Sequence, residues 1–102
     1  MTDLFDTKTQ LEAAFNVYDR ENPEVYRLFS KYSREAKARG FQNFGAKAVF
    51  ERLRWHLNIE TTGDEFKLNN NYPAFYARRL MREDKSFVGF FRTRKQAHER
   101  TI

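Results

Sequence analysis

The segment NPEVYRLFSKYSREAKARG, residues 22–40, has the clearest helical pattern in the chain. Asn22 stands at the N-cap position, Pro23 at the first helical position, and Gly40 follows a cationic last turn. The apolar side chains recur at the spacing of one helix face and are Val25, Leu28, Phe29, Tyr32 and Ala36. The opposite face carries Arg27, Lys31, Arg34 and Lys37. The segment therefore predicts a helix that buries one face and presents cations on the other.

Three further segments have helical spacing, at residues 7–20, 46–59 and 72–83. Their apolar faces comprise Leu11, Ala14, Phe15 and Tyr18, then Ala46, Val49, Phe50, Leu53 and Leu57, then Pro73, Tyr76, Ala77, Leu80 and Met81. A short last helix is expected at residues 86–94, with Ser86 as its N-cap. Together these segments predict a mainly α fold, a compact bundle of four to five helices.

Residues 60–68 break the helical period, because a Thr-Thr-Gly-Asp turn is followed by the alternating residues EFKL. This pattern predicts one short β-hairpin near residues 60–68. The helices at residues 23–39 and 45–58, joined by a glycine-bounded turn, also fit a helix-turn-helix motif, with the hairpin as a wing. A plain helical bundle explains the same pattern with fewer assumptions.

The 102 residues fit one helical domain at residues 1–92, followed by a polar tail at residues 93–102 that is expected to be frayed. The absence of cysteine excludes disulfides, thiolate zinc sites and cysteine nucleophiles. Apolar runs are far shorter than the roughly 20 residues that cross a bilayer. We therefore expect no membrane partner and a cytoplasmic location.

Charge is distributed unevenly along the chain. Residues 1–26 contain two basic and six acidic side chains, whereas the rest contains 17 basic and eight acidic side chains. This asymmetry favours a basic working surface on the later elements. The two histidines, His56 and His98, have no second ligand at helical spacing, and no nucleophile and base can be assembled. We expect no catalytic residues, no metal, no cofactor and no enzymatic activity.

The helix at residues 72–83 places Phe75, Arg78, Arg79 and Arg82 together, opposite its apolar face. Arginine guanidinium groups match phosphate oxygens, so this stripe is a candidate nucleic-acid surface. In the helix-turn-helix alternative, Lys47, Arg52 and Arg54 would contact the DNA groove. The arginines can equally serve only to solubilise an exposed helix face.

Asn69, Asn70 and Asn71 precede this helix. Asn70 or Asn71 can cap it, while the others bond to nearby backbone in a tight turn. Alternatively, Asn70 or Asn71 is exposed at the positive helix N-terminus and bonds a base edge, a phosphate or a partner's backbone. Both residues are therefore candidate nucleic-acid contacts.

The segments GAKAVFERLRW (residues 45–55) and KLNNNY (residues 67–72) resemble a family of small uncharacterised proteins encoded in bacteriophages, prophages and bacterial genomes. The resemblance extends over residues 12–92 and brings no established activity. It implies a bacterial or phage cytoplasm and a role among accessory proteins that bind DNA or a host protein. The residues that it singles out are Lys47, Glu51, Arg54, Trp55, Phe66, Asn69, Asn70, Asn71, Tyr72, Tyr76 and Arg78, with Trp55 and Tyr76 also explicable by packing.

Two functions follow as hypotheses. The first is a small accessory or regulatory protein that binds nucleic acid, with duplex DNA preferred, through a helical Arg/Lys face. The second is a protein-binding module, such as a phage-encoded modulator of a host enzyme or defence complex, with Phe75 as an aromatic anchor among arginines. A homodimer is compatible with either function.

Overall fold

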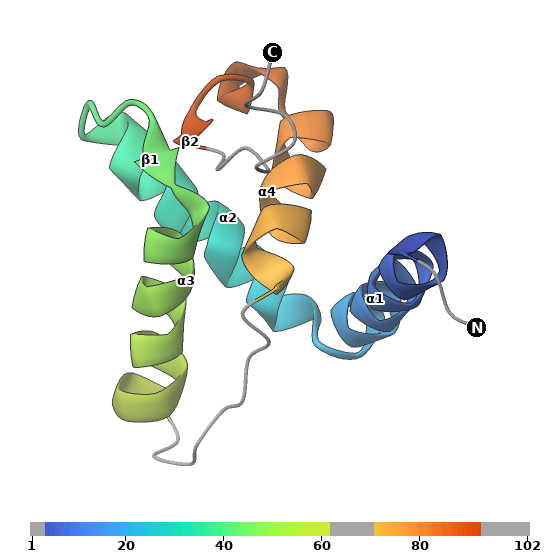
Figure 1. Ribbon diagram of the computed structural model, residues 1–102. Helices are drawn as coiled ribbons and strands as arrows, with labels where there is room; N and C mark the ends of the chain where they lie inside the picture. Colours follow the sequence, from blue (N-terminus) through green and yellow to red (C-terminus); the bar gives the residue numbers. More distant parts are fainter. Residues whose placement is uncertain (1–3, 62–70, 93–102) are drawn as a thin grey trace.

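The computed structural model describes residues 4–61 and 71–92, and it confirms a mainly α fold (Figure 1). The α-helices are α1 (Leu4–Glu21), α2 (Pro23–Ala38), α3 (Ala46–Trp55) and α4 (Tyr72–Glu83). A π-helix, η1 (His56–Thr61), continues α3, and a short 3-10 helix, η2 (Lys85–Phe87), follows α4. The strands β1 (Phe44–Gly45) and β2 (Phe91–Arg92) pair in parallel. The helix predicted at residues 72–83 has the same bounds in the structure.

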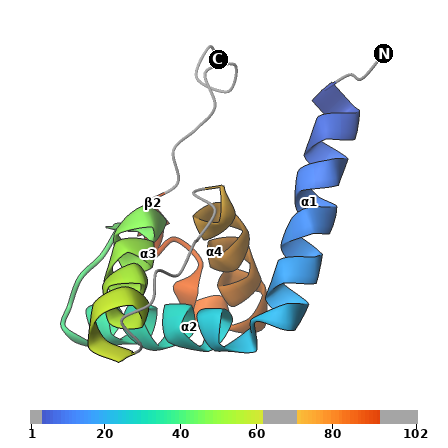
Figure 2. The ribbon, with the colours of Figure 1, turned by 90° about the horizontal axis from the view of Figure 1, so that it is seen from below.

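Helix α2 is the element on which the others assemble. It packs against α1, α3 and α4, and in Figure 2 these three helices rise from it. The predicted apolar face of α2 is buried in full: Val25, Leu28, Phe29, Tyr32 and Ala36. On the cationic face opposite, Arg27, Lys31 and Arg34 are exposed, whereas Lys37 is half-buried. The buried face that the sequence predicts for this helix is therefore confirmed.

Tyr76 of α4 lies at the centre of an aromatic core. Its ring is fully buried and lies 4.8 Å from the ring of Phe15 on α1, 5.7 Å from that of Phe29 on α2 and 5.9 Å from that of Phe50 on α3. One side chain thus contacts an aromatic ring from each of the other three α-helices. Large rings fill a small core efficiently, because each removes a large apolar area from water.

The predicted last helix at residues 86–94 is wrong. Asp84, rather than Ser86, is the cap of η2: its carboxylate accepts a hydrogen bond from the Ser86 backbone N–H at 3.0 Å. The backbone then turns at Gly89, whose φ of 86° ends any helix there. Beyond this turn, Phe44 N–H donates to the Phe90 carbonyl at 2.8 Å, which begins the pairing of β1 with β2.

Asn22 and Asn71, two of the three asparagines expected as caps, make no side-chain cap hydrogen bond. Asn22 precedes α2, but its side-chain amide donates backwards to the Tyr18 carbonyl at 3.0 Å, so it closes the end of α1. Asn71 occupies the N-cap position of α4 with helical backbone angles and no side-chain cap bond. Asn70 lies outside the described residues.

The two described residues of the hairpin expected near residues 60–68 are helical. Glu60 and Thr61 belong to η1, and the remainder of that stretch lies outside the described residues, as does the tail at residues 93–102. The connection between α2 and α3, residues 39–45, contains β1. It is longer than the turn of about three or four residues in a helix-turn-helix.

We expect acid to destabilise the fold through Asp84. Hydrogen bonds from the Ser86 hydroxyl and from Arg34, the latter at 2.7 Å, lower the pKa of Asp84 to about 2. Because the folded pKa lies below the unfolded one, the stabilisation is present above the unfolded pKa and is lost as pH falls from about 5 towards 2. Thermal unfolding followed by circular dichroism should show this loss. In Asp84→Asn the loss in that window should be smaller; an unchanged pH profile would contradict the assignment.

Candidate functional site

The outer face of α3 carries the most distinctive exposed side chains. Val49, Phe50 and Leu53 are buried, and on a helical wheel Trp55 lies opposite them. Trp55 is 56% exposed, and Ile59, one turn later in η1, is 61% exposed. We call Trp55 and Ile59 the crest. Because a tryptophan is large and apolar, its exposure at the crest marks a candidate contact surface.

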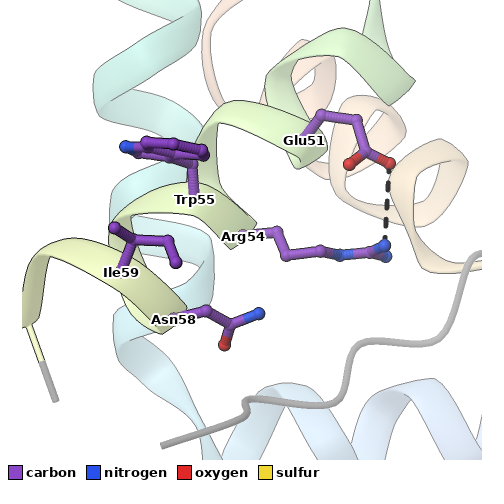
Figure 3. A pocket seen from close by; sticks show the side chains of 5 residues that line it. All are labelled: Glu51, Arg54, Trp55, Asn58 and Ile59. Atoms are coloured by element: carbon purple, nitrogen blue, oxygen red, sulfur yellow. Dashed lines mark ion pairs between the residues drawn. The ribbon is translucent and has the colours of Figure 1, made fainter. Parts of the chain in front are cut away.

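Beside the crest is a shallow depression of about 240 Å³. Glu51, Arg54 and Asn58 line it together with the crest, and Figure 3 shows Trp55 and Ile59 on one side of the helix and Arg54 on the other. The Arg54 guanidinium lies 3.7 Å from the Glu51 carboxylate. This ion pair is half-exposed, so solvent weakens it and it can exchange for another partner.

Arg52 lies on the flank of α3 that faces α2. Its guanidinium is 4.4 Å from the centre of the Tyr32 ring and 3.4 Å from the Glu60 carboxylate. Glu60 also contacts His56 Nδ1 at 2.9 Å. The contact with His56 and then that with Arg52 hold the pKa of Glu60 below its usual range. Lys47, the other predicted cation of α3, is exposed.

The arginine stripe predicted on α4 is divided by the structure. Arg78 and Arg82 are exposed, and the Arg78 guanidinium lies 4.9 Å from the centre of the Phe75 ring. Phe75 itself is half-buried and stacks on Phe15 of α1 at 4.8 Å, so it is not an exposed anchor. The expected surface therefore keeps two of its four members on the outer face.

Arg79 is held within the fold. Its guanidinium pairs with Asp19 of α1 at 2.5 Å and with Glu83 at 2.9 Å, and lies 3.8 Å from the centre of the Tyr26 ring on α2. The Tyr26 hydroxyl donates to Glu83 at 2.9 Å. Burial and this hydrogen bond raise the pKa of Tyr26 to about 12. Arg79 thus joins three helices, and these contacts favour a structural role for it.

A second surface, which the sequence did not indicate, lies between two turns. Phe41, 54% exposed, and Val88, 65% exposed, border a groove of about 350 Å³. Lys37 lines the same groove, and its ammonium group donates to the Ser86 carbonyl. Phe41 and Val88 have no helical or strand periodicity around them, so only the tertiary structure brings them together.

No protein-family model, curated protein or solved structure matches the chain. Within residues 4–61 and 71–92, no three His, Asp or Glu side chains gather closely enough to hold a metal ion. No helix in the same ranges has the length and apolar character needed to cross a membrane. The candidate site therefore rests on the geometry of α3, η1 and α4.

Proposed function

We propose that the protein binds nucleic acid through the exposed cations of α3 and α4. One observation carries the proposal: Lys47, Arg78 and Arg82 are exposed and have no ion pair with any carboxylate in the described parts of the chain. Such cations can neutralise phosphates without first breaking an ion pair. Arg52 joins them, because its exposed contact with Glu60 is weak.

Duplex DNA is the preferred ligand under this proposal, because it carries about one negative charge per 1.7 Å of helix axis. The α3 and α4 helices pack against each other, so their exposed cations lie on neighbouring elements. The resemblance of residues 12–92 to phage and prophage proteins supports an accessory or regulatory role in a bacterial cell. Arg27 and Lys31 on α2 add positive charge elsewhere on the surface.

A salt series tests the proposal. Polarisation of a labelled duplex, titrated between about 50 and 200 mM salt, should give a log–log slope of about −0.9 for each phosphate contact. Arg78→Ala should weaken binding at every sequence and reduce the size of that slope by about 1. Arg27→Ala removes the same charge from the face of α2 and is the matched control.

Two outcomes would end the proposal. One is the absence of binding to duplex, single-stranded and RNA probes at low salt. The other is binding that Arg27→Ala and Arg78→Ala weaken equally, since the proposed faces would then have no special role.

The Phe41–Val88 groove favours a second candidate function, binding of a protein partner. Exposed aromatic side chains in a groove are typical anchors of protein interfaces, and Phe41 replaces Phe75 in that role. Capture of host proteins from a nuclease-treated lysate separates the two functions. A stoichiometric partner that survives nuclease and is lost in Phe41→Ala would support the second function.

A further inference from the structure

Trp55 is the one tryptophan in the chain, and the fold leaves it in solvent. The aromatic core does not use it: the rings around Tyr76 come from Phe15, Tyr26, Phe29 and Phe50. Ile59 extends the apolar surface by one helical turn, and both side chains line the depression seen in Figure 3. The crest is therefore a flat aromatic face with an apolar neighbour.

Charge around the crest indicates the kind of partner. On the helical wheel, Lys47 and Arg54 lie on one flank of Trp55 and Arg52 lies on the other. Three of the four charged side chains of α3 are thus cations. The fourth, Glu51, pairs with Arg54, and Arg52 pairs with Glu60 of η1; both ion pairs are partly exposed, so phosphates can compete for the arginines. A ligand that places a planar group on Trp55 and negative charge along both flanks matches this arrangement.

We infer that Trp55 stacks on an unpaired base of the bound nucleic acid, while the flanking cations contact the adjoining phosphates. The inference rests on the proposed function and adds a base contact to it. In a blunt duplex each internal base is covered on both faces by its neighbours, so only the two terminal base pairs offer a face to an indole. In a single strand or an overhang, every base has a free face on which an aromatic ring can stack.

The single tryptophan makes the contact directly observable. Intrinsic fluorescence should fall when a single strand of about 12 thymidines is added, over the same concentrations that change the polarisation of the labelled strand. A blunt duplex should change the fluorescence much less. Because Trp55 is exposed, its replacement should leave the fold intact, and thermal unfolding checks that.

Variants of Trp55 test whether this side chain contributes to single-strand affinity. Trp55→Ala should weaken binding to the single strand by about 5- to 150-fold, the range expected for loss of one stacked base. Trp55→Phe, which keeps an aromatic ring, should restore most of the affinity. Val17→Ala, which trims an exposed apolar side chain on α1, outside both the crest and the Phe41–Val88 groove, should have no effect. Affinity for the blunt duplex should be the same in all of these proteins.

The outcomes separate the inference from the function on which it rests. Binding without quenching, or with equal affinity in Trp55→Ala, would overturn the stacking and leave phosphate binding in place. The absence of binding to any probe at low salt would overturn both. Unchanged single-strand affinity in Trp55→Ala, together with loss of a nuclease-resistant protein partner, would assign the crest to a protein instead.

Discussion

Tyr76→Ala is expected to lower the free energy of unfolding by about 3–5 kcal/mol, as found for large aromatic side chains removed from protein cores. Tyr76 is fully buried, and its ring contacts aromatic rings from α1, α2 and α3. Its loss would leave a cavity at the point where these helices meet. Urea denaturation followed by circular dichroism measures the change, and a loss below about 1 kcal/mol would contradict this central role.

Tyr76→Phe is the matched control, and it is not expected to lower the free energy of unfolding. The Tyr76 hydroxyl is buried, and no described residue forms a hydrogen bond with it. Burial, with Asp19 nearby, raises the pKa of this hydroxyl, so it stays neutral. Removing an unsatisfied hydroxyl while keeping the ring should leave stability unchanged or raise it slightly. A marked loss in Tyr76→Phe would show that the hydroxyl has a partner.

Arg79→Ala is expected to lower the free energy of unfolding by about 1–3 kcal/mol, whereas Arg78→Ala should change it by less than about 0.5 kcal/mol. The two residues are adjacent in sequence, but only Arg79 joins α1, α2 and α4. Its loss would leave the carboxylate of Asp19, whose side chain is 18% exposed, without its ion-pair partner. Denaturant unfolding of both variants measures the difference.

A double-mutant cycle isolates the ion pair. Asp19→Ala, Arg79→Ala and the double variant should show a coupling energy of at least about 0.5 kcal/mol, as expected for residues in direct contact. Additive effects would indicate that Arg79 stabilises through Tyr26 and Glu83 alone. In the DNA binding proposed above, Arg78→Ala should have a larger effect than Arg79→Ala, because Arg78 is exposed whereas Arg79 is half-buried.

The positions and buried faces of α2 and α4 follow closely from the sequence. Residues 72–83 show why: Pro73 favours a helix start, the apolar residues repeat at helical spacing, and the chain departs from helical backbone at Asp84. All of these signals act within a few residues, so no knowledge of the rest of the fold is needed. The same holds for the buried face of α2.

The candidate site is less accessible to sequence reasoning, because contacts between distant residues decide it. The helical wheel places Arg79 with Arg78 and Arg82. In the structure, however, Arg79 forms an ion pair with Asp19, 60 residues earlier, and is therefore less exposed than the other two arginines. Phe75 is half-buried for a similar reason, because its ring stacks on that of Phe15. The helical wheel does place Trp55 opposite the buried face of α3. Only the tertiary structure shows whether another element covers the face that carries Trp55.

The pairing of β1 with β2 also bears on how the chain folds during synthesis. Phe44 pairs with Phe91, so this contact closes a much longer loop than those between successive helices. Closing long loops costs more chain entropy, and such contacts form late. Phe87, Phe90 and Phe91 complete the core from this last segment. Until it has left the ribosome, the growing chain exposes the apolar surface that these three rings later cover, and it is at that stage that aggregation or chaperone binding competes with folding.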